Sequence, residues 1–533
     1  MCHFPIADAI AVTMACVMLV AAATAGEKTY SVLDYGAKPD GKTLCTEAIQ
    51  KAIDAAADGG GVVRLPKGTF HTGALRLRSR VTLQLDEGAT LLGSQEHEDY
   101  YGPAFDDEGR PVEGKRVFRS LIHCEGGHDI AIRGKGTLDG SGVAFRDKKK
   151  KRPKGLYLKD CRNVLVEGVH LKNAGCWMLH ARRCENVTIR NIDLFNHVAF
   201  NNDGLDIDSC RDVTITGCRV DSDDDAIVLK SLSDQPCRNV TVSNCIVSSH
   251  CNALKMGTES GGGFVDIRIS NCAVFSPKHT KKTYGRDRGL AGVALEIVDG
   301  GRLENVTVEN VDIDGVSVPI FLRLGNRARP YVKGAKPGVG TFRKVRLSNI
   351  SARGVSSIGC SITGLPGHCI EGVVLRNIQL TFEGKGTRED AAREIPEKDK
   401  NYPESTMFGT LPAYGFFCRH ARKLTFENIK LSTAEPDLRP AMVFDDVEDL
   451  VLKHLDAACS PGAAPMLRLV QVGNARMRGC SPTSPVDTLL QLQGDKTRDI
   501  VLEGCDLRHV KTVSALDPDV PKDALSEKDN TRP

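Results

Sequence analysis

The chain has 533 residues, and its 71 Lys and Arg residues nearly balance its 68 Asp and Glu residues. This near-neutral charge gives no global reason to expect a nucleic-acid partner or attraction to a membrane surface. The 52 glycines and the single tryptophan favour stacked short strands and turns over a large core rich in aromatic side chains.

The first segment has the pattern of an export signal. An apolar run begins near residue 10 and ends in Ala23-Thr24-Ala25, which resembles a small-residue cleavage site. We therefore expect residues 1–25 to be a signal peptide and the mature protein to be exported, periplasmic or secreted, with no stable membrane insertion. An uncleaved membrane anchor is the alternative, because no Lys or Arg precedes the apolar run.

The next element, residues 45–61, is predicted to be a short amphipathic helix. Thr46 is the candidate N-cap, and Ile49, Ile53 and Ala56 share one face of the helix. A helix at this place would cover the open end of a strand stack and prevent edge-to-edge association.

A short motif then recurs along most of the chain. Each copy has a turn residue followed by alternating apolar and polar positions, as in RNVLVEG and RDVTITG. The first spacings are 23, 26, 27 and 27 residues, and one later spacing is about 50. Periods of roughly 20–50 residues, built from strands without a helical pattern, indicate a solenoid. The turn residues are Asn163, Asn186, Asp212, Asn239, Asp266, Asn305, Lys344, Gly372, Lys423, Asp449 and Asp499.

We therefore predict an all-β fold, a single parallel β-helix over residues 26–515 that is capped by the N-terminal helix. Alternation of the kind V-T-I points apolar side chains inward and threonine outward. A β-propeller is the competing architecture, although its period is longer and less variable. Residues 516–533 are polar, and we expect them to be disordered.

Many of the 19 cysteines repeat with the motif. Equivalent positions in successive repeats favour stacked, buried thiols over a disulfide framework. The spacing matches no zinc motif. One column comprises Cys161, Cys184, Cys210 and Cys237, and a second comprises Cys218, Cys245 and Cys272.

Residues 201–230 hold eight aspartates between strand-like pieces. Counting from the turn residue of each repeat places Asp225 and Asn252 at the same offset, and matching DGLDID to DAIVLK places Asp203 beside Asp225. Successive rungs of a sheet lie about 4.8 Å apart. We therefore expect Asp203, Asp224 and Asp225 to form one carboxylate cluster on an outer face. Four others are expected to be solubilising turn residues at the surface: Asp206, Asp208, Asp212 and Asp221.

Carboxylates held this close cannot all be ionised at neutral pH, so at least one proton is retained. A protonated acid beside an anionic base is what the hydrolysis of a glycosidic bond requires. The spacing alone leaves three alternatives open: a calcium site, a lyase site, or aspartates with only a structural role.

Residues 176–231, which run from CWMLH through FNNDGLDID to DSDDDAIVLKS, resemble family 28 glycoside hydrolases, the polygalacturonase family. The resemblance extends to residues 30–54 and 59–94 and to the motifs GLAGVALEIVDGG and VPIFLRLGNR, and it covers most of the chain as far as Asp449. It implies a right-handed parallel β-helix of the pectin-lyase-like type, in agreement with the repeats.

The resemblance also assigns roles to individual residues. The family's N-T-D motif corresponds to Asn201-Asn202-Asp203, and its D-D pair corresponds to Asp224-Asp225. By this resemblance Asp224 is the general acid, and Asp203 and Asp225 hold and deprotonate a water molecule. Inversion at the anomeric carbon is implied, and no metal or other cofactor is implied.

Two motifs of the family are altered in this sequence. The family's G-H-G falls on Cys251-Asn252-Ala253, so Asn252 replaces the usual histidine, and His250 lies two positions away. The family's R-I-K falls on Ala294-Leu295-Glu296, so both cations that grip the galacturonate carboxylate are missing. Other cations are candidates to bind substrate in their place, although each is also a candidate for a structural ion pair: Lys230, Lys255, Arg288, Arg323 and Arg327.

Two basic loops, residues 146–155 and 278–289, would suit an anionic sugar chain, although solvated charged loops are common. A long insertion that ends with residues 394–423 is expected to wall one end of the substrate groove, which would favour release of single sugars from chain ends. Its candidate substrate contacts are Tyr402, Phe408, Tyr414, Arg419 and His420.

The sequence thus predicts an exported inverting glycosidase of the polygalacturonase type, whose partner is a pectic or other acidic polysaccharide or oligosaccharide. Two alternatives remain open. One is a polysaccharide lyase or epimerase that uses Lys255 or an arginine as base and holds calcium on the aspartates. The other is a β-helix that binds glycans without catalysis. The sugar, the linkage and the choice between internal and terminal cleavage do not follow from the sequence.

Overall fold

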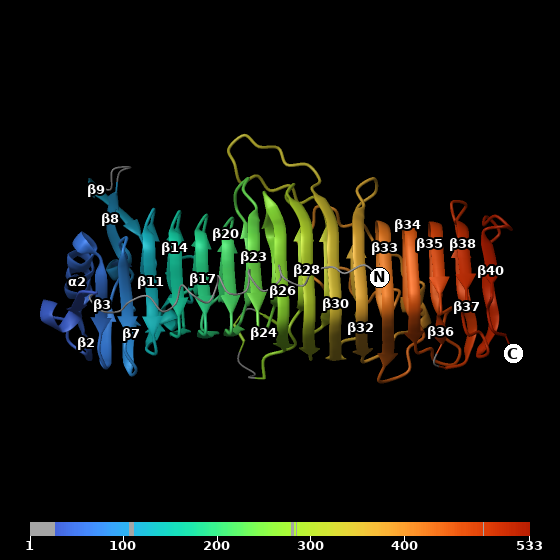
Figure 1. Ribbon diagram of the computed structural model, residues 1–533, viewed down its shortest axis with the longest axis horizontal. Coiled ribbons are helices and arrows are strands. Elements are labelled where there is room, and N and C mark those ends of the chain that lie inside the picture. The colour runs from blue at the N-terminus through green and yellow to red at the C-terminus, as the bar shows by residue number, and fades with distance from the viewer. Residues whose placement is uncertain (1–26, 106–110, 279–281, 284, 483, 533) are drawn as a thin grey trace, which may run out of the picture.

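The computed structural model describes residues 27–532 except for 106–110, 279–281, 284 and 483. The predicted signal peptide, residues 1–25, lies outside the described residues. Within the described ranges the chain forms one long stack of short strands, with a helix at one end (Figure 1). None of the helices in these ranges is long and apolar enough to cross a membrane.

The first face of the stack carries one strand of each coil, and every pairing along it is parallel. In the central coils each strand pairs with the strand three places further along the chain, so that Leu205 lies beside Ile227 and Ile227 beside Leu254. The strands of this face, in order, are β5 (Leu75–Arg76), β10 (Ile122–Glu125), β13 (Leu156–Lys159), β16 (Leu179–Arg182), β19 (Leu205–Asp208), β22 (Ile227–Ser231), β25 (Asn252–Ser260), β27 (Ala291–Ile297), β29 (Val318–Leu324) and β31 (Cys360–Thr363).

The second and third faces repeat the same parallel pattern. The second face begins with β1 (Thr29–Ser31), β3 (Gly61–Leu65), β6 (Val81–Leu85), β11 (His128–Gly134), β14 (Arg162–Glu167), β17 (Glu185–Arg190), β20 (Arg211–Thr216) and β23 (Cys237–Ser243). The third begins with β2 (Asp40–Leu44), β4 (Gly68–Thr72), β7 (Ala89–Gly93), β12 (Thr137–Asp139), β15 (His170–Lys172), β18 (Asp193–Asn196), β21 (Arg219–Ser222) and β24 (Ile246–Ser249).

Later coils join neighbouring faces into longer strands. The second and third faces continue together in β26 (Gly263–Phe275), β28 (Arg302–Asp314), β30 (Thr341–Val355) and β32 (Ile370–Phe382). The last coils contain β33 (Phe416–Thr433), β34 (Met442–Ala457), β35 (Leu467–Arg478), β36 (Ser481–Pro482), β37 (Val486–Gln493), β38 (Arg498–Glu503), β39 (Val510–Leu516) and β40 (Leu525–Lys528). Outside the stack lie the antiparallel pair β8 (Tyr101–Phe105) and β9 (Pro111–Phe118) and the short helix α3 (Arg388–Ala391).

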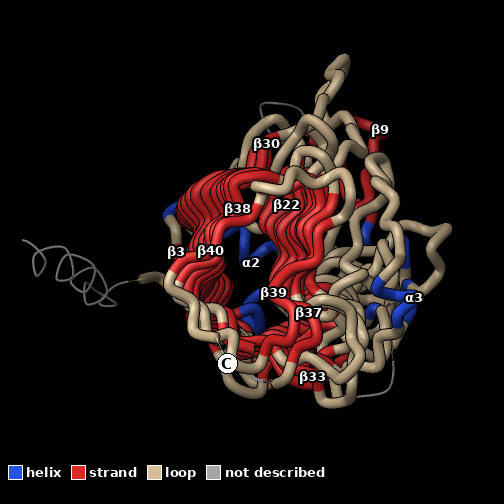
Figure 2. The backbone as a smooth tube through the Cα atoms, turned by 90° about the vertical axis from the view of Figure 1, so that its right-hand side faces the viewer, coloured by secondary structure: helices blue, strands red, loops and turns tan. Residues whose placement is uncertain are grey.

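The predicted parallel β-helix is confirmed, and a propeller built of separate blades is excluded. Figure 2, which looks along the stack, shows the strands of successive coils lying one behind another. In β20, Val213 and Ile215 are buried in the coil while Thr214 faces outward, as the alternation predicted. The interior is therefore a continuous column of apolar side chains.

The repeat motif places a left-handed backbone turn at the same position of each coil. All eleven turn residues named above have positive φ, between 53° and 67°. Asn and Asp tolerate this conformation better than most residues, because their short polar side chains form local hydrogen bonds. The side chains also bond from coil to coil, as Asn186 Nδ2 does to Asn163 Oδ1 at 2.9 Å. We call this row of residues the turn column.

The ends of the stack differ in two details from the expectations. Helix α2 (Thr46–Gly59) buries Ile49 and Ile53 as predicted, but Thr46 is its first helical residue rather than its N-cap, and the Thr46 hydroxyl accepts the N–H of Gly73 instead. The segment 516–533, expected to be disordered, contains β40, which pairs in parallel with β38. Val520 and Ala524 are buried in the apolar core and Leu525 packs against it, which allows this polar segment to add one more rung.

The cysteines behave as stacked thiols. All the cysteines from Cys45 onward are free in the described structure, and most are buried. Cys218, Cys245 and Cys272 occupy one position on three successive rungs, and each thiol donates to the carbonyl oxygen of the residue two places before it. The adjacent Cys245 thiol, together with burial, raises the pKa of Cys218 and Cys272. The prediction of buried columns is confirmed.

Candidate active site

Three aspartates meet at the corner where the third face turns into the first. Asp203 stands two residues before β19 and Asp225 two residues before β22, so the register of these strands places the two side chains on neighbouring rungs. One carboxylate oxygen from each of Asp203, Asp224 and Asp225 lies within 4.8 Å of the other two. The predicted grouping of these three residues is confirmed, and we call it the carboxylate cluster.

The three carboxylates have different partners. Asp203 Oδ2 lies 3.0 Å from the ammonium of Lys230, and Asp225 Oδ2 lies 3.0 Å from that of Lys255. Asp224, in contrast, accepts a hydrogen bond of 3.2 Å from the neutral amide of Asn201. Two members of the cluster thus have a cation that stabilises the ionised form, whereas the Asn201 amide that donates to Asp224 carries no charge.

Burial and mutual repulsion act in the same direction on Asp224. Burial raises the pKa of Asp224 well above its usual value, and the negative charges of Asp203 and Asp225 raise it further. Burial also raises the pKa of Asp203, but Lys230 counteracts the effect. Burial alone would lower the pKa of Lys255, yet Asp225 raises it well above its usual range. These surroundings therefore favour the neutral form of Asp224 and the charged form of Lys255.

Asn252, which stands where the family has a histidine, belongs to the cluster. It lies one rung beyond Asp225, as predicted, and its Nδ2 donates to Asp225 Oδ1 at 2.8 Å. Asn252 therefore orients one carboxylate oxygen of Asp225 while Lys255 contacts the other.

Two aspartates expected at the surface are in fact buried. Asp206 lies 2.9 Å from Lys230, and Asp208 lies 3.3 Å from both His180 and Arg182, with neither carboxylate exposed. Both belong to β19 and point away from the apolar interior, but neighbouring charged side chains cover them. Lys230 thus contacts both Asp203 and Asp206, whereas Asp212 is an exposed turn residue as expected.

Trp177 is a member of the site that the sequence analysis missed. It precedes β16 by two residues, which is the position that Asp203 has before β19, so it lies one rung before Asp203. The ammonium groups of Lys230 and Lys154 lie 4.0 and 4.2 Å from the centre of its ring. A single tryptophan at the same offset as the aspartates was the available signal.

The two basic loops adjoin this corner. In the loop 146–155, Arg152 donates to Asn201 Oδ1 at 3.0 Å, and Lys148 lies 3.7 Å from the ring centre of Phe200. The loop thus packs on the segment that leads into Asp203. In the described part of the loop 278–289, the N–H of Thr283 donates to Asp223 at 2.7 Å. Both loops therefore carry positive charge next to the carboxylate cluster.

On the other side of the cluster, Lys255 lies beside the position of the missing arginine. Lys255 pairs in register with Ala294 of the next rung. Glu296, at the position of the missing lysine, is buried, and this burial raises its pKa to about 8 although Lys255 acts against the shift. The ring of Tyr402 lies 5.8 Å from the Lys255 ammonium and is 53% exposed. Lys255 and Tyr402 therefore lie on the side of the cluster that holds Ala294 and Glu296.

Of the aromatic residues in the long insertion, only Tyr402 lies at the site as expected. Phe408 and Tyr414 are buried, so their rings are not available to a sugar. Phe408 packs against Phe321 and Phe417, which fastens the insertion to the outside of the first face. Two of the three aromatic residues predicted to contact substrate therefore stabilise the insertion.

The remaining candidate cations are engaged within the protein. Arg288 pairs with Glu383, and Arg327 pairs with Asp299 at 2.9 Å. Arg323 donates to the carbonyl oxygens of Gly364 and Glu397. Arg419 donates to the carbonyl of Ile395, and His420 lies 3.0 Å from the Glu397 carboxylate. These contacts hold loops and the insertion in place, which favours the structural interpretation of all five.

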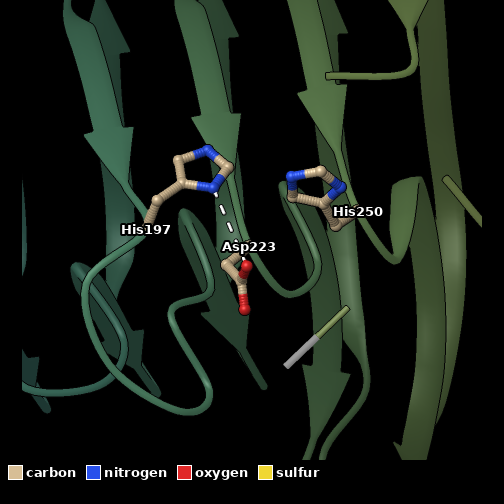
Figure 3. Close-up of side chains that lie close together, drawn as sticks. All are labelled: His197, Asp223 and His250. Carbon is tan, nitrogen blue, oxygen red and sulfur yellow. Dashed lines mark ion pairs between the residues drawn. The ribbon is translucent and has the colours of Figure 1, made fainter. Parts of the chain in front are cut away.

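His250 does not take the place of the histidine that Asn252 replaces. Its Nδ1 lies 2.6 Å from the carbonyl oxygen of Arg286, and its ring lies with His197 and Asp223 at the end of the third face (Figure 3). His250 therefore belongs to a second group of side chains next to the carboxylate cluster.

Comparison with known proteins places this architecture in a family. The model of glycosyl hydrolases family 28 matches residues 62–398, and a model described as rhamnogalacturonase A/epimerase, pectate lyase-like, matches residues 29–91. The chain is 31% identical over 221 residues to a probable polygalacturonase of Vitis vinifera, which covers 38% of this chain and 44% of the relative. It is 43% identical over 124 residues to an exo-poly-alpha-D-galacturonosidase of Dickeya chrysanthemi, covering 22% of this chain and 20% of the relative. The chain thus spans less than half of the length of these curated relatives.

Solved structures with the same fold include one named as an enzyme and one named as an adhesin. A hyperthermoactive exopolygalacturonase from Thermotoga maritima aligns with a TM-score of 0.59 and 22% identity, covering 76% of this chain and 92% of that one. PfbA, a surface adhesin of Streptococcus pneumoniae, aligns with a TM-score of 0.51 and 16% identity, covering 79% and 94%. At such identities the likeness shows the fold, and a fold alone does not establish an activity. The family model, however, matches more than half of the sequence, and the protein belongs to glycosyl hydrolases family 28.

Proposed function

We propose that the protein is an inverting glycoside hydrolase that cleaves glycosidic bonds in a pectic or related acidic polysaccharide. The observation that carries this proposal is the difference in partners within the carboxylate cluster. Asp203 and Asp225 each have a lysine at 3.0 Å, whereas Asp224 has an amide. This difference supports a proton donor, Asp224, beside anionic carboxylates, and glycosidic hydrolysis uses such a combination of acid and base.

In the proposed reaction Asp224 donates its proton to the glycosidic oxygen as the bond to the anomeric carbon breaks. A water molecule held by Asp203 and Asp225 attacks that carbon from the opposite side and transfers a proton to one of them. The products are a reducing sugar of inverted configuration and a shortened chain. Lys230 and Lys255 keep the two bases anionic before the step, and proton exchange with solvent restores Asp224.

The spacing of the cluster is also compatible with a second stereochemical course. Carboxyl oxygens within 4.8 Å of each other are closer than the roughly 6.5–9.5 Å typical of inverting enzymes, and resemble the roughly 5 Å of retaining ones. A retaining course would make Asp203 or Asp225 a nucleophile. We favour inversion because two adjacent carboxylates on neighbouring rungs are arranged to share one water molecule.

Charge near the cluster supports an acidic substrate. Lys230, Lys255 and Lys154 lie around it, and the loop 146–155 adds further cations. The rings of Trp177 and Tyr402, on opposite sides of the carboxylates along the stack, offer faces on which sugars stack. Two of the relatives are named as a probable polygalacturonase and an exo-poly-alpha-D-galacturonosidase, and these names also refer to an acidic sugar chain.

The lyase alternative is disfavoured by the charge on Lys255. A base must be neutral before it accepts a proton, but Asp225 raises the pKa of Lys255 well above its usual range.

The proposal that the protein is exported rests on the pattern in residues 1–25, and N-terminal sequencing of the mature protein tests it.

A panel of pectic oligosaccharides with the wild-type protein and an Asp224→Asn variant tests the proposed function. Mass spectrometry distinguishes fragments that have gained water from unsaturated fragments, and early proton NMR spectra identify the anomer formed first. We expect hydrated fragments of inverted configuration with the wild type and none above background with the variant. Unsaturated fragments would establish a lyase, and retained configuration would establish a covalent intermediate.

A further inference from the structure

A second group of chemically active side chains lies next to the carboxylate cluster and has no part in the proposed hydrolysis. His197, Asp223 and His250 each come directly after a strand of the third face, namely β18, β21 and β24. The last residues of these strands lie in register, because Asn196 pairs with Ser222 and Ser222 pairs with Ser249. The three residues therefore occupy one position on three successive rungs.

The side chains of these three residues converge. One potential ligand atom from each of His197, Asp223 and His250 lies within 4.8 Å of the other two, and Figure 3 shows both imidazole rings on either side of the aspartate. The three side chains are buried, with residue exposures of 3%, 0% and 1%. Two imidazoles and a carboxylate are a common ligand set for a divalent transition metal.

The outer nitrogens of both rings are already oriented by the protein. His197 Nε2 lies 2.8 Å from the carboxylate of Asp221, and His250 Nδ1 lies 2.6 Å from the carbonyl oxygen of Arg286. Histidines that bind metals usually donate their other N–H to a carboxylate or a backbone carbonyl, which sets the tautomer. The same arrangement here directs His197 Nδ1 and His250 Nε2 towards Asp223.

We propose that His197, Asp223 and His250 bind one divalent transition-metal ion of the Zn²⁺ class, through the inner ring nitrogens and the carboxylate. Imidazole ligands favour such an ion over Ca²⁺ or Mg²⁺, which prefer oxygen. Bonds of about 2.0–2.2 Å would draw the three ligand atoms somewhat closer together than they now lie. Water fills the remaining coordination.

The position of this site suggests what the ion does. The N–H groups of Thr283 and Gly285 donate to the Asp223 carboxylate at 2.7 and 3.3 Å, and the N–H of Arg286 donates to the carbonyl of His250 at 3.0 Å. The ion thus joins three rungs to the segment that holds Thr283, Gly285 and Arg286, directly beside Asp224. Its role is to hold these three residues in place, and the site does not depend on the hydrolase proposal.

Direct metal binding to the full chain, purified without a polyhistidine tag and stripped with a chelator, tests the proposal. After dialysis against micromolar free Zn²⁺, the wild type is expected to retain one equivalent by elemental analysis, and Co²⁺ is expected to give the visible absorption of a site with nitrogen ligands. Binding should raise the thermal unfolding temperature, since the ion binds only the folded state.

Variants locate the ion. His197→Gln and His250→Gln should each lose the bound equivalent, and Asp221→Asn should weaken binding by about 10–100-fold because it removes the group that orients His197. His170→Gln is the matched control, since this exposed histidine lies on the same face and pairs with Asp193 outside the site. It should bind like the wild type.

Two outcomes would overturn the proposal. One is a wild-type chain that retains no Zn²⁺ and shows no Co²⁺ absorption. The other is binding that persists unchanged in both His197→Gln and His250→Gln. If a variant fails to fold, X-ray absorption of the Zn²⁺-loaded wild type decides the question, because a shell without two imidazoles would be equally contradictory.

Discussion

The turn column and the carboxylate cluster are built from the same kinds of residue on successive rungs of one stack, yet they differ in chemistry. In the turn column, the side chain of Asn186 donates a hydrogen bond to that of Asn163 at the surface, and both groups are neutral amides. In the cluster, Asp203 and Asp225 are buried and each contacts a lysine. Repetition of a residue thus determines its position in the stack, whereas burial and the charge of the neighbours determine what it can do.

The largest expected effect is a loss of kcat when an aspartate is replaced in the carboxylate cluster but not in the turn column. Asp224→Asn removes the proposed proton donor, and we expect kcat to fall by about 10²–10⁴-fold, because this is the usual contribution of general acid catalysis. Asp212→Asn makes the same chemical change in the turn column and should leave kcat unchanged. Steady-state kinetics on the same substrate compares the two. Equal losses would mean that position in the cluster confers no special role.

A second change tests whether the cluster depends on its lysines. Lys230→Met leaves Asp203 and Asp206 buried without their cation, and we expect the free energy of unfolding to fall by about 3–5 kcal/mol. Arg211→Met, which breaks the exposed pair with Glu185, should lower the free energy of unfolding far less, because solvent screens exposed ion pairs. Urea denaturation measures both variants. Similar small losses would show that Lys230 is dispensable for the buried charges.

A smaller effect is expected from the aromatic residue beside the cluster. Trp177→Leu keeps an apolar side chain but removes the ring face, and we expect KM to rise by up to about tenfold with little change in kcat, since ring stacking contributes roughly 0.5–1.5 kcal/mol. Phe195→Leu, an exposed aromatic on the third face, is the control. An unchanged KM for the Trp177 variant would remove this residue from the substrate site.

The smallest effect concerns the turn column itself. Asn186→Ala places a Cβ in a left-handed conformation and loses the hydrogen bond to Asn163, so we expect a loss of about 1–2 kcal/mol in the free energy of unfolding. Asn186→Gly should recover part of that loss, because glycine adopts this conformation without strain. Chemical denaturation measures both, and activity at a temperature where both are folded should equal that of the wild type.

The fold and the centre of the site were predictable because both follow from periodicity. All eleven predicted turn residues have the left-handed conformation in the structure. The register that they define places Asp203 beside Asp225 and Asp225 beside Asn252. A strand order that repeats every three strands turns spacing along the chain into distance in space. This is the reason that carboxylates more than 20 residues apart could be grouped in advance.

Periodicity does not predict which outward-facing side chains are buried by neighbouring side chains or by an insertion. Asp206 and Asp208 alternate with inward-facing residues, so they appeared to be solvent-exposed, but Lys230 and His180 cover them. Phe408 and Tyr414 lie in an insertion that has no repeat, and its packing against the first face followed no pattern in the sequence. His197 and Asp223 have the right register but were not considered as a group.

The central claim is that Asp224 supplies the proton and Asp225 helps to activate water, and the most direct test compares leaving groups. The sugar identified in the panel is prepared with a dinitrophenyl leaving group, which departs without protonation, and its hydrolysis is measured with Asp224→Asn and Asp225→Asn. The account predicts that Asp224→Asn recovers most of its activity on this substrate while Asp225→Asn remains impaired on both substrates. Equal losses of the Asp224 variant on the natural and the activated substrate would contradict it.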